Sequence, residues 1–322
     1  EIVLIEAGPY ISFANCGLPY YVGGEIAQRD RLFVVTPEGF TRRFAVDVRL
    51  HTTVSGVDAQ QKTVTLCPAS GSSEELSYDR LILATGTVAV RPPIPGLNRK
   101  DIFTVRTVPD VDVIMSRLAA NGMIRETAAE VEGPPHMRAL VIGGGYIGLE
   151  TAEQLMRRGL KVTIVEMADR VMLALDREMS FPIVEALEHE GAEVVLSDAV
   201  AEVVDRDGQG LARTQSGREI PFDIGVLSVG VRPNVELARA AGIKLGRTGA
   251  IQVDRFQRTS DPSIYAAGDN SEAPHLVLNR PVNIPLAGPA NKAGRAAGAN
   301  AALDLTGVGE SDPRRLELRG VL

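Results

Sequence analysis

The pattern of apolar and polar residues changes character near residue 138. Upstream, residues 46–57 and 63–66 alternate between apolar and polar positions, which predicts two β-strands joined by a turn at 58–61. Downstream, fully apolar runs alternate with segments whose apolar residues recur at helical spacing. In order, these are "RALVI", "LETAEQLMRRG", "KVTIVE", residues 180–189 and "AEVVLS". Strands that alternate with helices predict a parallel, doubly wound α/β sheet.

Shorter patterns predict further elements outside this region. An apolar run ends in Glu6, "YDRLILATG" predicts a buried strand running into a glycine, and residues 111–120 predict an amphipathic helix. Residues 119–137 are polar and predict a connection. "SIYAAGD" is strand-like, and the Gly- and Ala-rich residues 287–303 predict a helix packed closely against a sheet or a ligand.

Composition narrows the class of protein. The 322 residues exceed one ordinary core, so we expect two or three domains. The chain has 44% hydrophobic residues, a net charge of −7 and no run of Lys and Arg, which argues against nucleic acid as a partner. No apolar run has the length of a membrane span, so we expect no membrane partner. Two cysteines fit a reducing cytoplasm better than secretion.

Metal binding is not expected from the sequence. The four histidines are scattered, and none lies at metal-ligand spacing from Cys, Asp or Glu. They are His51, His136, His189 and His275.

The strand–helix–strand after residue 138 carries a dinucleotide-binding pattern. Gly143, Gly145 and Gly148 follow a strand and open a helix, and the next strand ends in Glu166, 18 residues after the last glycine. The first glycine permits the tight turn, the second permits close approach of a pyrophosphate, and the third permits close helix–strand packing. The helix N-terminus then faces the phosphates.

Glu166 favours NADH over NADPH. A carboxylate accepts a hydrogen bond from the ribose 2′-OH and repels a 2′-phosphate. Of the residues that follow, Met167, Ala168 and Asp169 offer a phosphate no partner, which leaves Arg170 as the one candidate.

The stretch "ISFANCGLPYYVGG" holds Cys16, one of two cysteines. Asn15 offers a hydrogen-bond donor, Gly17 leaves access, and the following segment can begin a helix that stabilises a thiolate. No second cysteine lies two to five residues away, so an internal redox disulfide is excluded. A lone redox cysteine can hold a mixed disulfide or cycle through a sulfenic acid. For Cys67 we expect a small buried residue without a chemical role.

These motifs together resemble the flavoprotein pyridine nucleotide–disulfide oxidoreductases. "ISFANCGLPYY" is similar to the single-cysteine branch typified by coenzyme A-disulfide reductase, and "LATG", "SVGVRPN" and "YAAGD" follow in the family's order. The resemblance covers nearly the whole chain. It implies two Rossmann-like domains, with an NAD(P)-binding domain inserted into a discontinuous FAD-binding domain, and it implies FAD and NADH (or NADPH) as cofactors.

The resemblance also implies domain boundaries. It places the first part of the FAD domain at 1–108, the NAD(P) domain at 109–231, the second part of the FAD domain at 232–305 and the start of a link at 306–322. In the family, a glycine fingerprint precedes the position of residue 1 and a dimerisation domain follows the link. We therefore expect this chain to be the interior of a longer, homodimeric protein.

Roles for individual residues follow from the same resemblance. Cys16 is the implied catalytic residue. Glu6 would bind the FAD ribose, Thr85 and Gly86 would lie beside the flavin, and Asp269 would bind the ribityl chain. The N–H of Ala287 would face the flavin pyrimidine edge. Gly230 would mark the return to the FAD domain. The NAD(P) set is Gly143, Gly145, Ile147, Gly148, Glu150 and Glu166, with Glu150 near both flavin and nicotinamide.

The implied activity is NAD(P)H-dependent reduction of a small-molecule disulfide, either coenzyme A disulfide or a persulfide or polysulfide. Ser12 and Asn15 match positions near the coenzyme A thiol, and Arg42 and Arg43 are candidates for a coenzyme A phosphate or a solvated basic pair. Tyr20 and Tyr21 are expected to pack. Two alternatives stay open: an NADH oxidase or peroxidase that uses a cysteine sulfenic acid, and a truncated, non-catalytic nucleotide-binding remnant.

Overall fold

The computed structural model describes residues 1–124 and 137–321, which form two compact units. The first unit contains Glu1–Ile11, Pro37–Val88 and Arg232–Leu322, and the second contains Ser12–Thr36 and Ala89–Val231. The predicted boundaries at 108, 231 and 305 stay a prediction. His136 and most of the connection predicted at 119–137 lie outside the described residues, while 119 and 120 belong to a helix.

A five-stranded parallel sheet forms the frame of the second unit. Its order is β11-β10-β9-β15-β8, and each neighbouring pair is parallel. The strands are β8 (Ile102–Phe103), β9 (Arg138–Ile142), β10 (Lys161–Val165), β11 (Glu193–Val195) and β15 (Ile224–Leu227). The helices are α1 (Leu18–Gly23), α3 (Val108–Ala120), α4 (Tyr146–Arg157) and α5 (Arg177–His189), with short 3-10 turns at Asn15–Gly17 and Arg29–Leu32. The predicted α/β class is confirmed.

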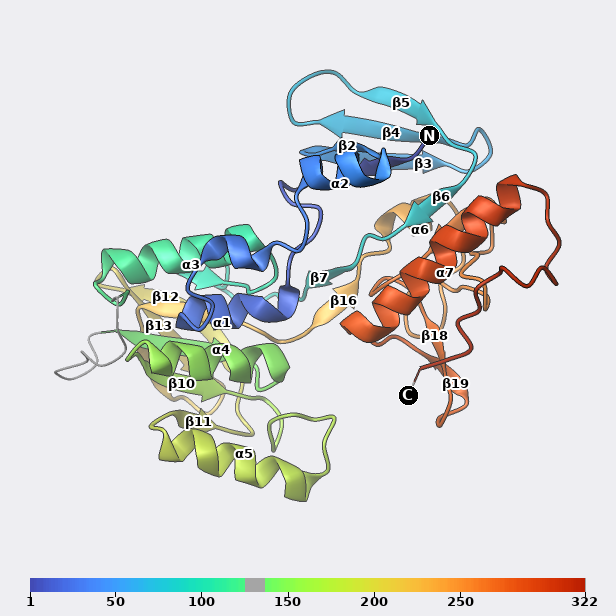
Figure 1. Cartoon of the computed structure of the whole chain (residues 1–322). Coiled ribbons are helices and arrows are strands. Elements are labelled where there is room, and N and C mark those ends of the chain that lie inside the picture. The colour runs from blue at the N-terminus through green and yellow to red at the C-terminus, as the bar shows by residue number, and fades with distance from the viewer. Residues whose placement is uncertain (125–136, 322) are drawn as a thin grey trace. The chain divides into compact units, whose positions relative to one another are not determined.

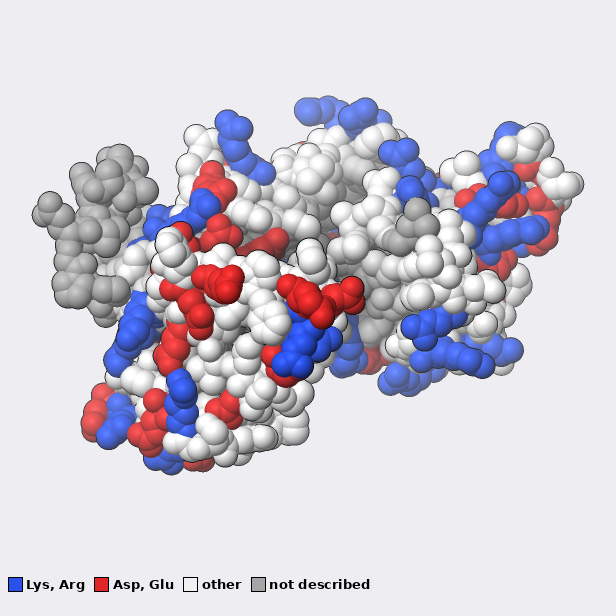
Figure 2. Space-filling view, turned by 90° about the horizontal axis from the view of Figure 1, so that it is seen from below, with Lys and Arg blue, Asp and Glu red and all other residues white. Residues whose placement is uncertain are grey.

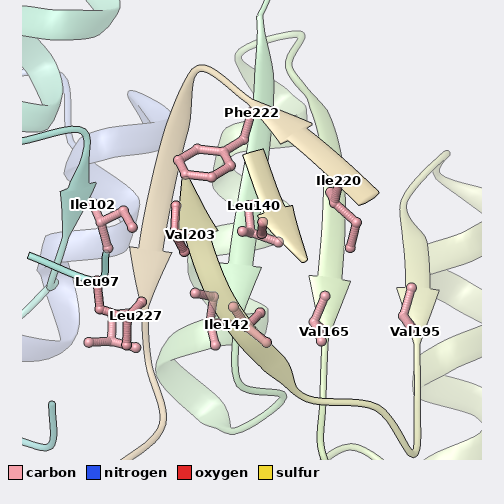
Figure 3. Close-up of a cluster of buried hydrophobic side chains, with 12 residues drawn as sticks. Leu97, Ile102, Leu140, Ile142, Val165, Val195, Val203, Ile220, Phe222 and Leu227 are labelled. Atoms are coloured by element: carbon pink, nitrogen blue, oxygen red, sulfur yellow. The ribbon is translucent and has the colours of Figure 1, made fainter. Parts of the chain in front are cut away.

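An antiparallel sheet covers one face of this frame. It contains β12 (Val200–Arg206), β13 (Gln209–Thr214) and β14 (Glu219–Phe222), which the sequence analysis did not predict. Figure 3 shows Leu140 and Ile142 of β9 on the same side as Val203 and Phe222, with which they form one buried cluster. Because strand side chains alternate, Ala139 and Val141 face the other way, and α4 packs against β9.

Several small sheets make up the first unit. Its parallel pairs are β1 (Val3–Ile5) with β2 (Asp47–Arg49), and β6 (Leu81–Leu83) with β17 (Ile264–Ala266). Its antiparallel sheets are β3 (Thr52–Asp58), β4 (Thr63–Pro68) and β5 (Glu74–Ser77), and β18 (Ala273–His275) with β19 (Arg280–Val282). Its helices are α2 (Pro37–Phe44), α6 (Glu236–Ala240) and α7 (Ala287–Leu305), and β7 (Thr87–Ala89) pairs with β16 (Val231–Pro233) where the chain passes between the units.

The expectation of a buried strand in "YDRLILATG" is only partly met. In β6, Leu83 is buried, but Ile82 is 40% exposed. The Gly- and Ala-rich helix behaves as predicted, because Ala293, Ala297 and Ala301 of α7 pack against the buried Tyr265 of β17. Small side chains bring the backbone of α7 close to the sheet.

Helix α1 is fixed to α4 within the second unit, and it lies between α3 and α4 in Figure 1. Gln154 of α4 is fully buried, and its Oε1 has no hydrogen-bond partner among the described atoms. It lies against Gly23, where an added Cβ would be 1.7 Å from Oε1. Arg158 Nε donates to the Val22 carbonyl oxygen at 2.8 Å, and Gln154 Nε2 donates to Glu25 at 3.0 Å.

A largely buried carboxylate on α7 holds the C-terminal segment in place within the first unit. Asp304 of α7 accepts hydrogen bonds from Arg315 at 2.6 Å, from Arg258 and from the Tyr265 hydroxyl. Burial alone would raise the pKa of Asp304, but these three donors lower it to about 2. The folded state therefore prefers the ionised carboxylate.

The surface carries charges of both signs. On the face drawn in Figure 2, Lys and Arg side chains are interspersed with Asp and Glu, and no continuous basic band appears among the residues coloured there. In the part of the chain that the structure describes, no helix is long and apolar enough to cross a membrane.

Gly23→Ala is expected to destabilise the protein by about 1–3 kcal/mol, because the new methyl group would overlap the buried Gln154. Urea unfolding measures this change. The control is Gly294→Ala on α7, where an added Cβ meets no atom within 4 Å, and where removing a helical glycine is expected to stabilise by about 0.5–1 kcal/mol. Equal stability of Gly23→Ala and the parent would contradict the packing described above.

Stability is expected to fall as the pH decreases from about 4 to about 2, because Asp304 has a lower pKa folded than unfolded. Its contribution is fully present above the unfolded pKa and disappears on protonation. Asp304→Asn should lose about 2 kcal/mol at neutral pH and show a correspondingly flatter acid dependence. Urea unfolding across this pH range measures both, and parallel pH profiles of the two proteins would refute the assignment.

Candidate functional site

The glycine turn between β9 and α4 has a separate steric reason for each glycine. Gly143 has φ +108°, and an added Cβ would lie 2.5 Å from the Ser228 carbonyl oxygen. At Gly148 it would lie 2.1 Å from the Gly143 carbonyl oxygen, so the first turn of α4 touches the loop backbone. Gly145 is exposed, and no atom lies within 4 Å of its Cβ position. The turn is therefore closed on its protein side and open to solvent at its middle.

This geometry fits a bound pyrophosphate. Gly145 is the N-cap of the 12-residue helix α4 and supplies no side-chain cap. The first N–H groups of a helix have no partner within the helix, and they carry the positive end of its dipole. Ile147 lies half-buried in this first turn, next to Gly148. The open space at Gly145 thus lies beside donors that an anion can occupy.

Glu166 is fixed to the same turn. Its Oε2 accepts a hydrogen bond from the Gly144 N–H at 2.6 Å, and its Oε1 accepts one from the Ala168 N–H at 2.8 Å. Each carboxylate oxygen has further lone-pair capacity, so a ribose hydroxyl can still donate to this group. The predicted ribose acid and the predicted phosphate turn are therefore neighbours.

Cys16 lies in the 3-10 turn Asn15–Gly17 that precedes α1, as expected for a segment that begins a helix. Its thiol is free, and both Cys16 and Asn15 are exposed. The backbone around the cysteine is fixed, since the Ala14 N–H donates to the Leu32 carbonyl oxygen at 2.8 Å and the Val34 N–H donates to that of Ser12. An accessible thiol on a fixed backbone suits a nucleophile.

A contact that was not predicted from the sequence joins this segment to helix α4, which begins at the glycine turn. The Tyr20 hydroxyl of α1 donates to Glu150 Oε1 of α4 at 3.5 Å, although Tyr20 was expected only to pack. Burial raises the pKa of Glu150, and the negative charge of Glu150 raises the pKa of Tyr20. No motif spacing reveals this pair, because its members are 130 positions apart.

In the first unit, Thr85, which the resemblance assigns to FAD, is hydrogen-bonded to the buried side-chain amide of Asn270. Asn270 Nδ2 donates to Thr85 Oγ1 at 3.0 Å and to the Leu83 carbonyl oxygen at 2.9 Å. Thr85 Oγ1 donates in turn to the Asn234 carbonyl oxygen at 2.5 Å. Asn270 is fully buried, yet its Oδ1 has no partner among the described protein atoms. Such an orphaned acceptor fits a site that a polar cofactor completes.

The remaining FAD candidates lie in the same unit. Gly86 has φ +65°, and its carbonyl oxygen accepts from the Asn234 N–H. The Asp269 carbonyl oxygen accepts from Asn283, and Glu6 Oε1 accepts from the Gly8 N–H at 2.6 Å. Ala287 is the exposed first residue of α7, whose N-cap, Leu286, provides no side-chain acceptor. Sequence reasoning missed Asn270, although it follows Asp269 directly.

Other sequence assignments receive no such support. Arg42 and Arg43 are exposed on α2, and Arg43 lies over the Phe44 ring at 5.1 Å, so their phosphate role stays a prediction. Gly230 has φ +107° directly before β16, and its predicted role also stays untested. Among the described residues, no group of three or more His, Cys, Asp or Glu side chains is placed to hold a metal ion.

The expectation that Cys67 is buried was wrong, while the expectation that it has no chemical role stays a prediction. Its side chain is partly exposed, and it donates to the Ser55 hydroxyl at 3.2 Å, with the Ser73 hydroxyl at 3.5 Å. These hydrogen bonds lower the pKa of the thiol, and the one with Ser55 has the larger effect. The cause is the pairing of β3 with β4, which places Cys67 on the open side of a small sheet. Both cysteines are free thiols.

Comparison with known proteins identifies the family. The family model described as pyridine nucleotide-disulphide oxidoreductase matches residues 1–291. The chain is 35% identical over 303 residues to an NADH oxidase of Methanocaldococcus jannaschii, covering 94% of this chain and 64% of the relative. It is 32% identical over 294 residues to a coenzyme A disulfide reductase of Staphylococcus aureus, covering 91% and 63%.

A solved structure supports the same grouping. The NAD-dependent persulfide reductase from A. fulgidus aligns with a TM-score of 0.88 and 38% identity, over 100% of this chain and 56% of that chain. The chain thus spans somewhat less than two thirds of the curated relatives described above. On the family match over most of its length, this chain belongs to the pyridine nucleotide-disulphide oxidoreductases, an enzyme family that uses FAD and NAD(P)H.

Proposed function

We propose that this chain takes part in the NAD(P)H-dependent reduction of a small-molecule disulfide, with coenzyme A disulfide as substrate and Cys16 as the redox-active residue. The observation that carries the proposal is the exposed, free Cys16 thiol, held just before a helix that packs on the dinucleotide helix α4. The name of the Staphylococcus aureus relative supports the choice of coenzyme A disulfide, and that of the A. fulgidus enzyme supports a persulfide as a related substrate.

The proposed chemistry at Cys16 has two steps. The thiolate attacks one sulfur of the substrate disulfide, which forms a mixed disulfide on Cys16 and releases the other half as a thiolate. FAD, when bound, would supply the two electrons taken from NADH. Two-electron cleavage of the mixed disulfide would release the second half as a thiolate and restore the Cys16 thiolate. The proton of the hydride and one proton from solvent would convert the two released thiolates into thiols. The sum is one disulfide, one hydride and one proton converted into two thiols, with Cys16 regenerated.

The chain's own residues have supporting roles in this scheme. The glycine turn at Gly143–Gly148 and the carboxylate of Glu166 would hold the dinucleotide, and Thr85, Asp269 and the N-terminus of α7 would hold FAD. Asn15, exposed beside Cys16, would donate to the thiolate. The contact between α1 and α4 would keep Cys16 at a fixed distance from the glycine turn, since both helices belong to one unit.

Cys16→Ser is expected to lower NADH-dependent disulfide reduction about 100-fold or more, because a serine hydroxyl cannot form the mixed disulfide. Release of coenzyme A thiol, followed with a thiol reagent, measures the loss. Reduction of bound flavin by NADH, followed by absorbance, should be unaffected. Cys67→Ser is the control and should retain activity. Disulfide reduction that persists in Cys16→Ser would exclude this cysteine as the redox residue.

A second candidate function is that of an NADH oxidase, favoured by the 35% identity to the Methanocaldococcus jannaschii relative of that name. In that reading, Cys16 cycles through a sulfenic acid instead of a mixed disulfide. Stoichiometry distinguishes the two functions. We expect NADH consumption to require the disulfide and to yield two thiols per NADH. Equal consumption with oxygen alone, and no thiol release, would favour the oxidase.

A further inference from the structure

The loop that follows Glu166 folds back onto the glycine turn. At its start, Glu166 accepts from the Gly144 N–H, and at its end the Met172 N–H donates to the Gly144 carbonyl oxygen at 2.9 Å. Val171 also packs there, because an added Cβ on Gly144 would lie 2.9 Å from Val171 Cγ1. The residues between these ends therefore lie next to the predicted ribose acid.

Two arginines near this loop share one carboxylate. Arg170 donates to Asp169 Oδ1 at 3.0 Å, and Arg177, at the start of α5, lies 3.3 Å from Asp169 Oδ2. Arg170 Nε is buried and has no hydrogen-bond partner among the described atoms. Asp169 thus takes up the charge of the residue that the sequence analysis identified as the candidate partner for a 2′-phosphate.

We propose that Asp169 is a specificity-determining residue that disfavours NADPH by holding Arg170, which would otherwise be available to a 2′-phosphate. The inference rests on the proposed dinucleotide site and adds to it the residue that selects between two pyridine nucleotides. Glu166 alone repels a 2′-phosphate, but a neighbouring free arginine would offset that repulsion with bidentate, charge-assisted hydrogen bonds. Asp169 prevents this offset.

Competition for the guanidinium groups is the physical basis of this selection. Asp169 pairs with Arg170 through one oxygen and with Arg177 through the other, so a 2′-phosphate would have to compete for guanidinium groups that already have a partner. NADH carries a 2′-OH at this position and does not compete for them. Specificity is therefore obtained by disfavouring the wrong ligand.

The test measures dissociation constants for NADH and NADPH by fluorescence titration at low and physiological salt, with parent protein, Asp169→Asn and Asp169→Asn/Arg170→Ala. Asparagine keeps the size of the side chain and removes the charge. Glu188→Gln is the matched control, since it removes one negative charge from an exposed position on α5 in the same unit.

Asp169→Asn should bind NADPH about tenfold more tightly, with NADH affinity unchanged within about twofold. The double variant should lose the gain, and Glu188→Gln should show none. If the parent binds NADH but Asp169→Asn gains no NADPH affinity, or gains it equally in the double variant, the inference is overturned and the proposed function stands. If the parent binds neither nucleotide, the proposed dinucleotide site is overturned together with the inference.

Discussion

The contact between Gly23 and the buried side chain of Gln154 is the constraint on which the arrangement of the second unit depends. A glycine is required there because any larger residue would overlap Gln154. The close approach lets Arg158 reach the Val22 carbonyl oxygen and lets Glu25 meet Gln154. Helix α1 is therefore fixed to α4, and the turn that carries Cys16 is fixed with it.

The same helix α4 begins at the glycine turn, so one rigid element relates the proposed nucleophile to the proposed nucleotide site. Tyr20 and Glu150 meet along this interface. Glu166 and the loop up to Met172 close around the other side of the glycine turn. Packing that excludes side chains at Gly143 and Gly148 leaves Gly145 open, which is where an anion can approach.

The sequence predicted what depends on local pattern. The strands and helices from β9 to β11 follow from uninterrupted periodicity, and the glycine spacing placed the turn on the correct strand–helix junction. The antiparallel sheet was missed, although Asp207–Gly208 between β12 and β13 is a strong hairpin signal with positive φ at both positions. Residues 200–222 contain many charged residues, which interrupt the alternation of apolar and polar positions that would predict the flanking strands.

Contacts between distant residues were beyond sequence reasoning. From the sequence, Gln154 is a polar residue of a predicted helix. It is fully buried in the structure because α1 packs over it. The part that Asn270 plays in the buried network is likewise seen only from its hydrogen bonds to Thr85 and Leu83. The burial of Cys67 was predicted wrongly. The alternation of residues in a strand does not show which face of a small sheet is covered by other elements. From the sequence, Asp169 was recognised only as a residue that cannot bind a phosphate. Its hydrogen bond with Arg170 is seen only in the structure.

The central claim is that Cys16 is the thiol that reacts with the substrate disulfide. Peptide mass spectrometry after brief exposure of the reduced protein to coenzyme A disulfide tests it most directly, because both thiols are free and Cys67 is an internal comparison. We predict one coenzyme A adduct on Cys16 that dithiothreitol removes, and none on Cys67. An adduct confined to Cys67, or no adduct on Cys16, would contradict it.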